Sequence, residues 1–419
     1  MGEVPIVERT GNVLRFQWPS LNIAATLRRL RSEGAYTKGE ITWISTAPGG
    51  GGHLHQGVLT LNSSNSKAQL ARILGERFDL DWSVLIEQLA VEALKFHRQG
   101  EPAVPIRTQG EEAKPIEPAI EPLSFREQPC VIFGEPGTAK SYLALLMALQ
   151  AAAQKVIPGI PLRPHGDFKV LYLDWESCLQ DQAVRLSRLE RGLGVEADGK
   201  IHYRYCAAPL SHDIEQIQEL VLDTGANFLV IDSLGLAAGD DLKGNEAPQE
   251  FFRALRTLRC TSLIIGHCTK NAEPWKRTIY GSQFFTALAR SIAEVRTSQE
   301  ANGNELYVAI YHRKNNIGRL YRPFALRFVF EGNHGPVKVL PQDIGELPDL
   351  AEGLSVPERI LNLLTHSSKP MFPKEVADQL GIAGNTARQT LRRMLRKGQV
   401  VQLEDGRYAA RAPEEEVPF

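Results

Sequence analysis

The stretch CVIFGEPGTAKSYLALL, residues 130–146, decides the fold of this chain. Its first four residues form an unbroken apolar run that predicts a buried strand, and the residues from Tyr142 onward have helical character. Between them lies a loop, Gly134 to Ser141, that contains two glycines and ends in Lys-Ser. A strand, a glycine-containing loop and a helix in this order suit an anion, because loop N–H groups and the helix N-terminus face it. The stretch therefore predicts a P-loop that binds the phosphates of a nucleotide.

The two residues that close this loop carry the chemistry of the predicted site. The ammonium of Lys140 would reach the β- and γ-phosphate oxygens of ATP, and the hydroxyl of Ser141 would bind its Mg²⁺. Ala139 stands where the usual G-x-x-x-x-G-K-[ST] pattern has its second glycine. Alanine is the smallest replacement, so we expect nucleotide binding to be retained, with an altered loop backbone as an open alternative. The predicted nucleotide contacts are Gly134, Glu135, Pro136, Gly137, Thr138, Ala139, Lys140, Ser141 and Tyr142.

Two further apolar runs end in carboxylates. The run NFLVIDS reaches Asp232, the Walker B form, which predicts a group for the magnesium site alongside Ser141. The run VLYLDWE ends in Asp174 and Glu176, and we prefer Glu176 as the residue that acts on the attacking water, with Asp174 as the alternative. The carboxyl ends of parallel strands gather along one edge beside the ligand, so we expect these side chains to lie close together.

A third apolar run, SLIIGH, ends in His267, with Lys270 close behind. Taken alone, a histidine here is more often a polar strand end than a functional group. Its position after the strand of Asp232 favours a residue that senses the γ-phosphate.

The chain divides into several predicted units. Short apolar runs alternate with helical segments across the middle of the chain, which predicts an α/β domain with a mostly parallel sheet and crossover helices. Residues 99–123 are dense in Pro and Glu and predict an extended linker. The glycines at 49–52 predict a flexible loop and no phosphate site, since no Lys-Ser follows them. The predicted units are a small α+β domain at 1–98, the linker at 99–123, the ATPase domain at 124–341, a linker at 342–354, a helical domain at 355–411 and an acidic tail at 412–419.

Composition narrows the functional class. The formal net charge is −1, so any contact with nucleic acid must come from a local basic surface. The five cysteines are scattered without a C-x-x-C pair, which argues for reduced thiols and against both a disulfide framework and a zinc site. The first residues lack the pattern of a secretory signal, and no apolar stretch has the length of a membrane span. We expect a cytoplasmic protein.

The last unit resembles a winged helix-turn-helix domain. Its pattern predicts helices at 356–364, 373–380 and 385–397, followed by a hairpin around Asp405-Gly406. The third helix presents a basic face suited to phosphates and a major groove, although such domains also bind proteins. The predicted nucleic-acid contacts are Arg388, Gln389, Arg392, Arg393, Arg396 and Lys397.

Six ordered motifs between residues 128 and 330 resemble the RecA-like ATPases of the plasmid RepA type, a family of small hexameric replicative helicases. The motifs are GEPGTAKS, VLYLDWES, LVIDSL, IIGHCTK, GSQFFTALAR and RKNNIG. The resemblance implies that Lys140 and Ser141 hold the phosphates and the metal, that Asp232 supports the metal, and that Glu176 acts on the catalytic water. It implies that His267 links nucleotide state to DNA contact.

The same resemblance assigns residues to the contact between subunits. Arg290, nine residues after Gly281, falls at the place of an arginine finger that completes the neighbouring subunit's site. Lys314, Asn316 and Gly318 match a late motif near the same interface. A surface role remains open for both Arg290 and Lys314.

The expected function is that of a DNA-associated ATPase, a ring-forming and hexameric helicase or translocase. It would hydrolyse ATP to move on single-stranded DNA in the replication of a bacterial chromosome, plasmid or phage, with duplex DNA at the C-terminal domain and a replication partner at the N-terminal one. Two alternatives remain: a non-motor switch, such as a loader or regulator, and a DNA-binding adaptor that barely turns ATP over.

Overall fold

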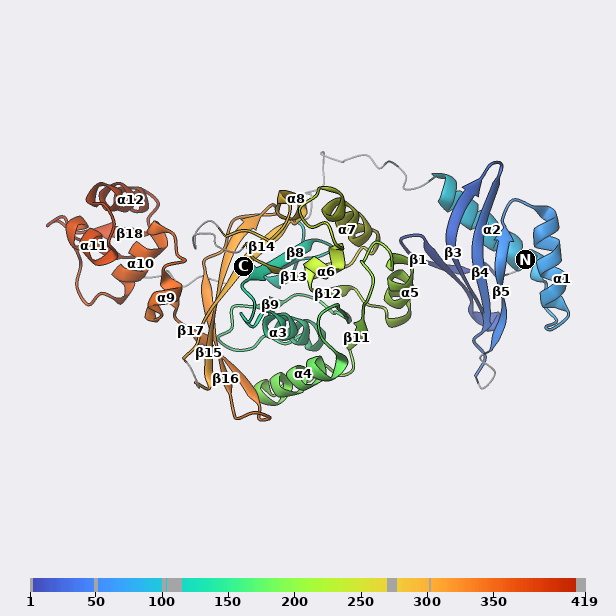
Figure 1. The fold of residues 1–419 in the computed structure, drawn as a ribbon, viewed down its shortest axis with the longest axis horizontal. Helices are drawn as coiled ribbons and strands as arrows, with labels where there is room; N and C mark the ends of the chain where they lie inside the picture. Colours follow the sequence, from blue (N-terminus) through green and yellow to red (C-terminus); the bar gives the residue numbers. More distant parts are fainter. Residues whose placement is uncertain are drawn as a thin grey trace.

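The computed structural model describes residues 3–48, 52–99, 103, 115–269, 277–300 and 303–411. Three folded units follow one another along the chain (Figure 1). The glycines at 49–51, Lys270 and the acidic tail at 412–419 lie outside the described residues.

The N-terminal unit is a five-stranded antiparallel sheet with two helices packed on one face. The strands are neighbours in sequence order. They are β1 (Ile6–Thr10), β2 (Val13–Trp18), β3 (Ile23–Glu33), β4 (Tyr36–Ser45) and β5 (His53–Thr60), with a 3-10 turn at Pro19–Leu21, and the helices are α1 (Ser64–Gly75) and α2 (Trp82–Gln99). The rings of Trp18, Trp43 and Trp82 form the centre of its core, with successive centroids 5.4 Å apart. The predicted α+β character of this unit agrees with these elements.

The central unit is built on a nine-stranded mixed sheet. Its order is β11-β10-β12-β13-β8-β14-β15-β16-β17; the first six strands run parallel and the last three are antiparallel additions. The strands are β8 (Pro129–Gly134), β10 (Val170–Asp174), β11 (Ile201–Tyr205), β12 (Phe228–Asp232), β13 (Thr261–His267), β14 (Ser291–Ser298), β15 (Glu305–Asn315), β16 (Phe324–Phe330) and β17 (Val337–Gln342).

Helices cover both faces of this sheet (Figure 1). Helices α3 and α4 pack on one face, where α3 contributes an almost continuous apolar row. Helices α5, α6, α7 and α8 pack on the other. Their bounds are α3 (Lys140–Ala153), α4 (Leu179–Leu193), α5 (Ile214–Thr224), α6 (Leu234–Ala238), α7 (Glu246–Thr257) and α8 (Gln283–Leu288). Burial on both faces explains why the parallel strands are unbroken apolar runs in the sequence.

The predicted linker at 99–123 is too long at its C-terminal end. Residues Pro118–Glu121 form β6, which pairs with β7 (Ser124–Phe125) and β9 (Arg163–Pro164), and Ala119, Ile120 and Leu123 are fully buried. Proline density predicted an unpacked chain, but Pro118 opens its strand, a position where proline is tolerated. The central unit therefore begins near residue 118.

The predicted linker at 342–354 is also packed. It contains a 3-10 turn at Ile344–Glu346 and helix α9 (Pro348–Ala351). Ile344, Leu350 and Leu354 pack against Tyr311 of β15, whose hydroxyl donates a hydrogen bond to the carbonyl of Leu350. The apolar spacing of this segment matches one helical face, and this buried face outweighs the Gly and Pro residues that predicted a break.

The C-terminal unit has three helices followed by a two-stranded hairpin, in the predicted order. The elements are α10 (Val356–His366), α11 (Pro373–Leu380), α12 (Gly384–Arg396), β18 (Val400–Gln402) and β19 (Tyr408–Ala410). A β-bridge from Met371 to Tyr408 attaches the hairpin to the segment between α10 and α11. Gly381 ends α11 in the left-handed conformation with φ of 62°, which glycine adopts without strain.

Among the described residues, we find no helix with the length and apolar character that crossing a bilayer demands.

Candidate nucleotide site

The P-loop backbone depends on a left-handed residue directly before α3. Ala139 has φ of 52° and ψ of 22°, and Gly137 has φ of 78°. Glycine takes this conformation freely, whereas the Cβ of alanine makes it unfavourable by about 1 kcal/mol. The alanine at this position therefore has a strained backbone. The loop is otherwise formed, and α3 still begins at Lys140.

Lys140 is buried inside the loop that it closes. Its Nζ donates to the carbonyls of Gly134 and Glu135, at 3.2 and 2.6 Å, and to Oγ1 of Thr138 at 3.1 Å. Burial lowers the pKa of Lys140, and the nearby Cys268 and Asp232 oppose that shift. The side chain is thus positioned at the loop by three oxygen atoms, where phosphate oxygens could take over its hydrogen bonds.

Asp232 joins the P-loop to the Walker B strand. Its Oδ2 accepts hydrogen bonds from the Ser141 hydroxyl at 2.8 Å and from the Tyr172 hydroxyl at 2.7 Å. Burial raises the pKa of the Asp232 carboxyl, and the two hydroxyl donors oppose that shift. Burial beside Asp232 also raises the pKa of Tyr172 well above its usual value, so the tyrosine remains a donor.

The oxygen ligands at Ser141 and Asp232 suit Mg²⁺, which takes some of its ligands from water and phosphate. They do not suit a metal ion that is bound by protein side chains alone. A hydroxyl and a carboxylate oxygen are the hard ligands that Mg²⁺ accepts, usually alongside waters and substrate phosphates. Within the described residues, no three His, Cys, Asp or Glu side chains are grouped to hold a metal by themselves. A magnesium ion here would therefore depend on the nucleotide for its remaining ligands.

Glu176 is the carboxylate that extends past the strand ends. Its Oε1 accepts hydrogen bonds from the hydroxyl of Ser233 and from Nε2 of His267, the latter at 3.3 Å. The hydrogen bond from His267 is the main cause that lowers the pKa of Glu176, against the opposing effect of burial. The group is therefore ionised at neutral pH and half-buried beside the P-loop lysine.

Asp174, the alternative for that role, is fully buried and engaged in structure. Its Oδ1 accepts from the backbone N–H groups of Glu176 and Ser177, both at 2.9 Å, and its Oδ2 accepts from the amide of Gln182 at 2.8 Å. These three bonds shape the turn from β10 into α4 and leave the carboxylate without a face toward solvent. The geometry favours Glu176.

Register explains why these groups meet. Asp174 pairs with Asp232 across neighbouring parallel strands, and His267 pairs with Gly134. All four lie at the carboxyl edge of the sheet, where the sequence predicts them. Tyr172 and Ser233 were missed by sequence reasoning, although Tyr172 lies two residues before Asp174 and so shares its side of the strand.

Tyr142 lies on the outer side of the P-loop helix. Its ring packs edge-on against Phe330, with the centroids 5.5 Å apart, and the guanidinium of Arg185 lies 6.0 Å from its centroid. A flat ring beside a planar cation offers a surface for an aromatic base. Arg185 was not predicted from the sequence, because it is far from the P-loop along the chain and only the fold places it beside Tyr142.

Arg290 lies at the opposite edge of the sheet from this cluster. It is exposed and lies after the end of α8, outside any helix. Its backbone N–H donates a hydrogen bond to the carbonyl of Pro129 at 3.0 Å. Pro129 begins β8 and Gly134 ends it, and a strand of that length spans about 17 Å. Arg290 therefore lies at the amino edge of the sheet, about one strand length from the P-loop of its own chain.

The side chain of Lys314 forms its hydrogen bonds with carbonyl groups of its own chain. Its Nζ donates to the carbonyls of Thr286, Ala287 and Ala289, at 2.7, 2.9 and 2.7 Å, at the C-terminal end of α8. Burial, and then the neighbouring Arg290, lowers its pKa. The N–H of Asn316 donates to the carbonyl of Arg290 at 2.9 Å. These residues brace the segment that carries Arg290, and a contact of Lys314 with another subunit stays a prediction.

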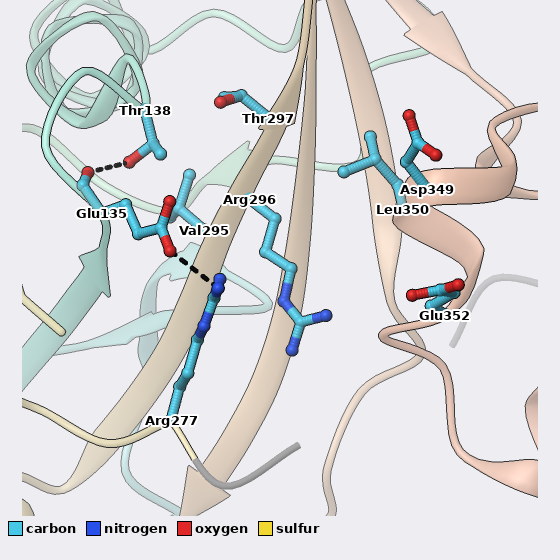
Figure 2. A pocket seen from close by; sticks show the side chains of 9 residues that line it. All are labelled: Glu135, Thr138, Arg277, Val295, Arg296, Thr297, Asp349, Leu350 and Glu352. Atoms are coloured by element: carbon cyan, nitrogen blue, oxygen red, sulfur yellow. Dashed lines mark hydrogen bonds and ion pairs between the residues drawn. The ribbon is translucent and has the colours of Figure 1, made fainter. Parts of the chain in front are cut away.

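Two cavities lie at the candidate site, and one of them is lined by P-loop residues. One of about 350 Å³ lies beyond Glu176 and His267 and has apolar walls from α6 and from Ile279 and Tyr280. The other, of about 190 Å³, lies between the P-loop and α9 and is shown in Figure 2. There Arg277 pairs with Glu135 of the P-loop at 2.7 Å. The second cavity is lined both by the P-loop and by residues of the 349–352 segment, which connects the central unit to the C-terminal unit.

The face of α12 that is predicted to contact nucleic acid is exposed to solvent. Arg388, Gln389, Arg392, Arg393, Arg396 and Lys397 are all exposed. None of them forms an ion pair with another described residue. Ala387, Leu391 and Met394, on the other side of the helix, are buried, and the last two belong to the core of the unit.

The middle of the chain is similar to known proteins. Residues 95–273 match the family model of an AAA domain. The DNA repair protein RadA of Chlamydia pneumoniae is 26% identical over 193 residues, which are 44% of this chain and 36% of RadA. The chain thus matches about a third of the length of that relative. The matched stretch contains the P-loop and five strands of the mostly parallel sheet, and this α/β arrangement is that of a RecA-like P-loop core, as predicted. The central unit is called the AAA domain below.

A solved structure is similar in part. The KaiC-like protein PH0186 from Pyrococcus horikoshii OT3 covers 55% of this chain and 99% of its own length, at 18% identity and a TM-score of 0.38.

Proposed function

We propose that this protein is a ring-forming motor ATPase that moves on single-stranded DNA as a helicase or translocase in the replication of a bacterial chromosome, plasmid or phage. The observation that carries the proposal is the separation of Arg290 from Glu176 across the sheet of one chain. A cation on the amino edge can complete a phosphate site only on another copy. Head-to-tail contacts of this kind close into rings, and a hexamer is the assembly that we propose.

The residues of the AAA domain have separate tasks in this reaction. Lys140 and the loop N–H groups would hold the β- and γ-phosphates, while Ser141 and Asp232 would hold Mg²⁺, which neutralises charge on the phosphates. Ionised Glu176 would accept a hydrogen bond from the attacking water and orient it. The finger Arg290 of a neighbouring subunit would stabilise charge that develops on the transferred group.

His267 provides a route from the nucleotide to the surface. Its ring contacts Glu176, and the N–H of Tyr280 donates to its carbonyl at 2.8 Å. Tyr280 is partly exposed and lines the apolar cavity next to Glu176. We propose that DNA contact near Tyr280 and nucleotide state at Glu176 affect each other through this histidine.

The C-terminal unit is proposed to be a winged helix-turn-helix domain that binds duplex DNA. Three helices, a hairpin and the exposed basic face of α12 support this proposal. Binding that rests on arginine–phosphate contacts weakens steeply with salt. The N-terminal unit is a proposed site for a replication partner, and the proposed compartment is the cytoplasm.

A non-motor switch is the second candidate. The cavity between the P-loop and α9 supports it, because Glu135 of the P-loop and residues of the connector to the C-terminal unit line the same space. In that case ATP would control how the C-terminal unit binds DNA or a partner, without movement along DNA.

Steady-state ATP hydrolysis with and without single-stranded DNA, followed by strand separation, tests the proposal. A motor shows hydrolysis stimulated by DNA and strand separation that requires ATP. Stimulated hydrolysis without unwinding or translocation would replace the motor with the switch, and tight ATP binding without turnover would leave only the adaptor.

A further inference from the structure

The N-terminal unit contacts the AAA domain through a row of ion pairs on α5. Arg15 of β2 pairs with Asp223, and two arginines of β3 pair with the other two acidic residues of the helix. Arg28 meets Glu219 at 2.9 Å, and Arg29 meets Glu215 at 2.9 Å. Figure 1 shows β1 and its neighbours beside α5.

The three carboxylates form one stripe along α5. Residues 215, 219 and 223 are four apart, so they lie on nearly the same side of the helix and recur about every 6 Å. The helix carries no lysine, arginine or histidine between Ile214 and Thr224. Its opposite side is apolar, and Ile217 and Val221 are buried in the core of the AAA domain.

A close backbone contact fixes where the two units meet. Gly11 and Asn12 form the turn between β1 and β2, and the Asn12 N–H donates to Oε1 of Gln218 at 3.2 Å. The same amide donates from Nε2 to Thr257 at 2.9 Å, which holds it in place. A Cβ at Gly11 would collide with the Gln218 side chain. The contact is therefore specific in position as well as complementary in charge.

Among the described residues, polar side chains make most of the contact, and Val13 of β2 is a fully buried apolar residue that belongs to neither apolar cluster. Leu14 and Phe16 belong to the core of the N-terminal unit, and the apolar residues of α5 belong to that of the AAA domain; the two clusters are separate. The side chains of the ion pairs keep between 20% and 55% of their surface exposed. Ion pairs of this kind are individually weak and are screened by salt, and a polar interface of small extent is typical of units that move apart.

The number of residues that join the two units sets how far apart they could lie. Residues 100–117 lie between α2 and β6, and a chain of that length can span at most roughly 60 Å. A tether of this kind raises the effective concentration of the two surfaces to the millimolar range, so that even a weak interface forms. Weak contact and tethering together give a docked state that opens readily.

We propose that the acidic stripe of α5 is a docking surface that holds the N-terminal unit reversibly, by charge. When the ion pairs are screened or broken, the unit undocks and moves on its tether, which lets it reach a partner away from the AAA domain. This inference concerns the position of the unit alone and does not depend on ATP hydrolysis or on DNA.

Energy transfer between two dyes on the full-length chain tests the proposal. The dyes are attached through Lys95→Cys on α2 and Arg163→Cys on the AAA domain, in a Cys178→Ser background, because Cys178 is the exposed cysteine among the five. We expect transfer to fall by half or more between about 50 and about 500 mM salt, as the screening length shortens. Transfer that stays constant over this range overturns the proposal.

Charge reversal locates the surface. Asp223→Arg is expected to lower transfer at low salt at least twofold, and the swap Arg15→Asp with Asp223→Arg to restore it. Glu196→Arg, an exposed position elsewhere in the AAA domain, is the matched control and should leave transfer unchanged. Equal effects of Asp223→Arg and Glu196→Arg would refute a specific docking surface.

Hydrogen exchange gives a second reading without dyes. The Asn12 N–H is protected by Gln218 only in the docked state. We expect its exchange to accelerate several-fold in Asp223→Arg and at high salt, while exchange in the core of the N-terminal unit stays slow. Unchanged exchange at Asn12 under both conditions contradicts undocking.

Discussion

The Ser141 hydroxyl lies 2.8 Å from Oδ2 of Asp232, although the two residues are 91 positions apart in the chain. This contact connects the P-loop to the Walker B strand, and Tyr172 reaches the same oxygen from a third strand. The proposed magnesium site is therefore assembled by the sheet and not by any one segment of the chain.

Lys140→Ala should reduce ATP hydrolysis about 100-fold or more, because a positioned cation for the phosphates is lost. Steady-state hydrolysis and nucleotide binding measure the effect, and circular dichroism checks the fold. Lys155→Ala, at an exposed position after α3, is the control and should keep full activity. Unaltered hydrolysis in Lys140→Ala would show that the nucleotide lies elsewhere.

Glu176→Gln should bind ATP normally and lose turnover by about 100-fold, because the amide cannot accept the proton or orient the water as a carboxylate does. Asp174→Asn should act differently. It weakens the three hydrogen bonds that shape the turn after β10 and should lower the melting temperature. Thermal unfolding together with hydrolysis separates the two, and a Glu176→Gln enzyme with normal turnover rules out its role.

Glu176 should remain ionised into acid below the ordinary pKa of a glutamate. The pKa of Glu176 is lowered, chiefly by the hydrogen bond from His267. The group therefore stays ionised, and any stability that it contributes is complete above its unfolded pKa and is lost only as pH falls through the lower folded value. His267→Ala should move the acid limb of the pH–rate profile to higher pH. If the acid limb does not shift in His267→Ala, His267 does not control the ionisation of Glu176.

Arg290→Ala should retain ATP binding and lose turnover by 100-fold or more, since fingers of this kind have effects of at least that size. Mixing Arg290→Ala subunits with Glu176→Gln subunits should restore part of the activity, because some interfaces then combine an intact finger with an intact glutamate. If the mixture is as inactive as its components, the finger does not act between subunits.

Ala139→Gly should stabilise the AAA domain slightly, by about 0.5 kcal/mol. Relief of the left-handed strain contributes about 1 kcal/mol, and the greater freedom of glycine in the unfolded chain offsets about half of it. The unfolding transition of the AAA domain, followed by calorimetry, measures the change. Clear destabilisation would mean that the loop does not hold this backbone conformation in solution.

Replacing Arg388 and Arg392 together by alanine should weaken duplex DNA binding about uniformly across sequences and reduce the salt dependence by about two phosphate contacts. Fluorescence anisotropy at several salt concentrations measures both. Lys369→Ala, exposed in the same unit but off α12, is the control. A variant pair with unchanged affinity would assign the basic face another role.

Local patterns in the sequence determined much of this protein. The apolar runs, the P-loop between strand and helix, the six ordered motifs and the helices and hairpin of the C-terminal unit could be read from short-range periodicity, because these features depend on neighbours within a few residues. The carboxyl-edge positions of Asp232, Glu176 and His267 followed from the rule that parallel strands end together.

The tertiary structure alone decided how distant segments meet. Strand order and register brought Tyr172 to Asp232 and turned Asp174 into a structural acceptor, which no spacing along the chain reveals. Packing drew residues 118–123 and the expected linker at 342–354 into the core, held Lys314 on α8, and set the arginines of the N-terminal sheet against α5. Such contacts depend on the competition between buried surface, charge pairing and chain entropy over the whole fold, and that balance is not written in any single stretch of sequence.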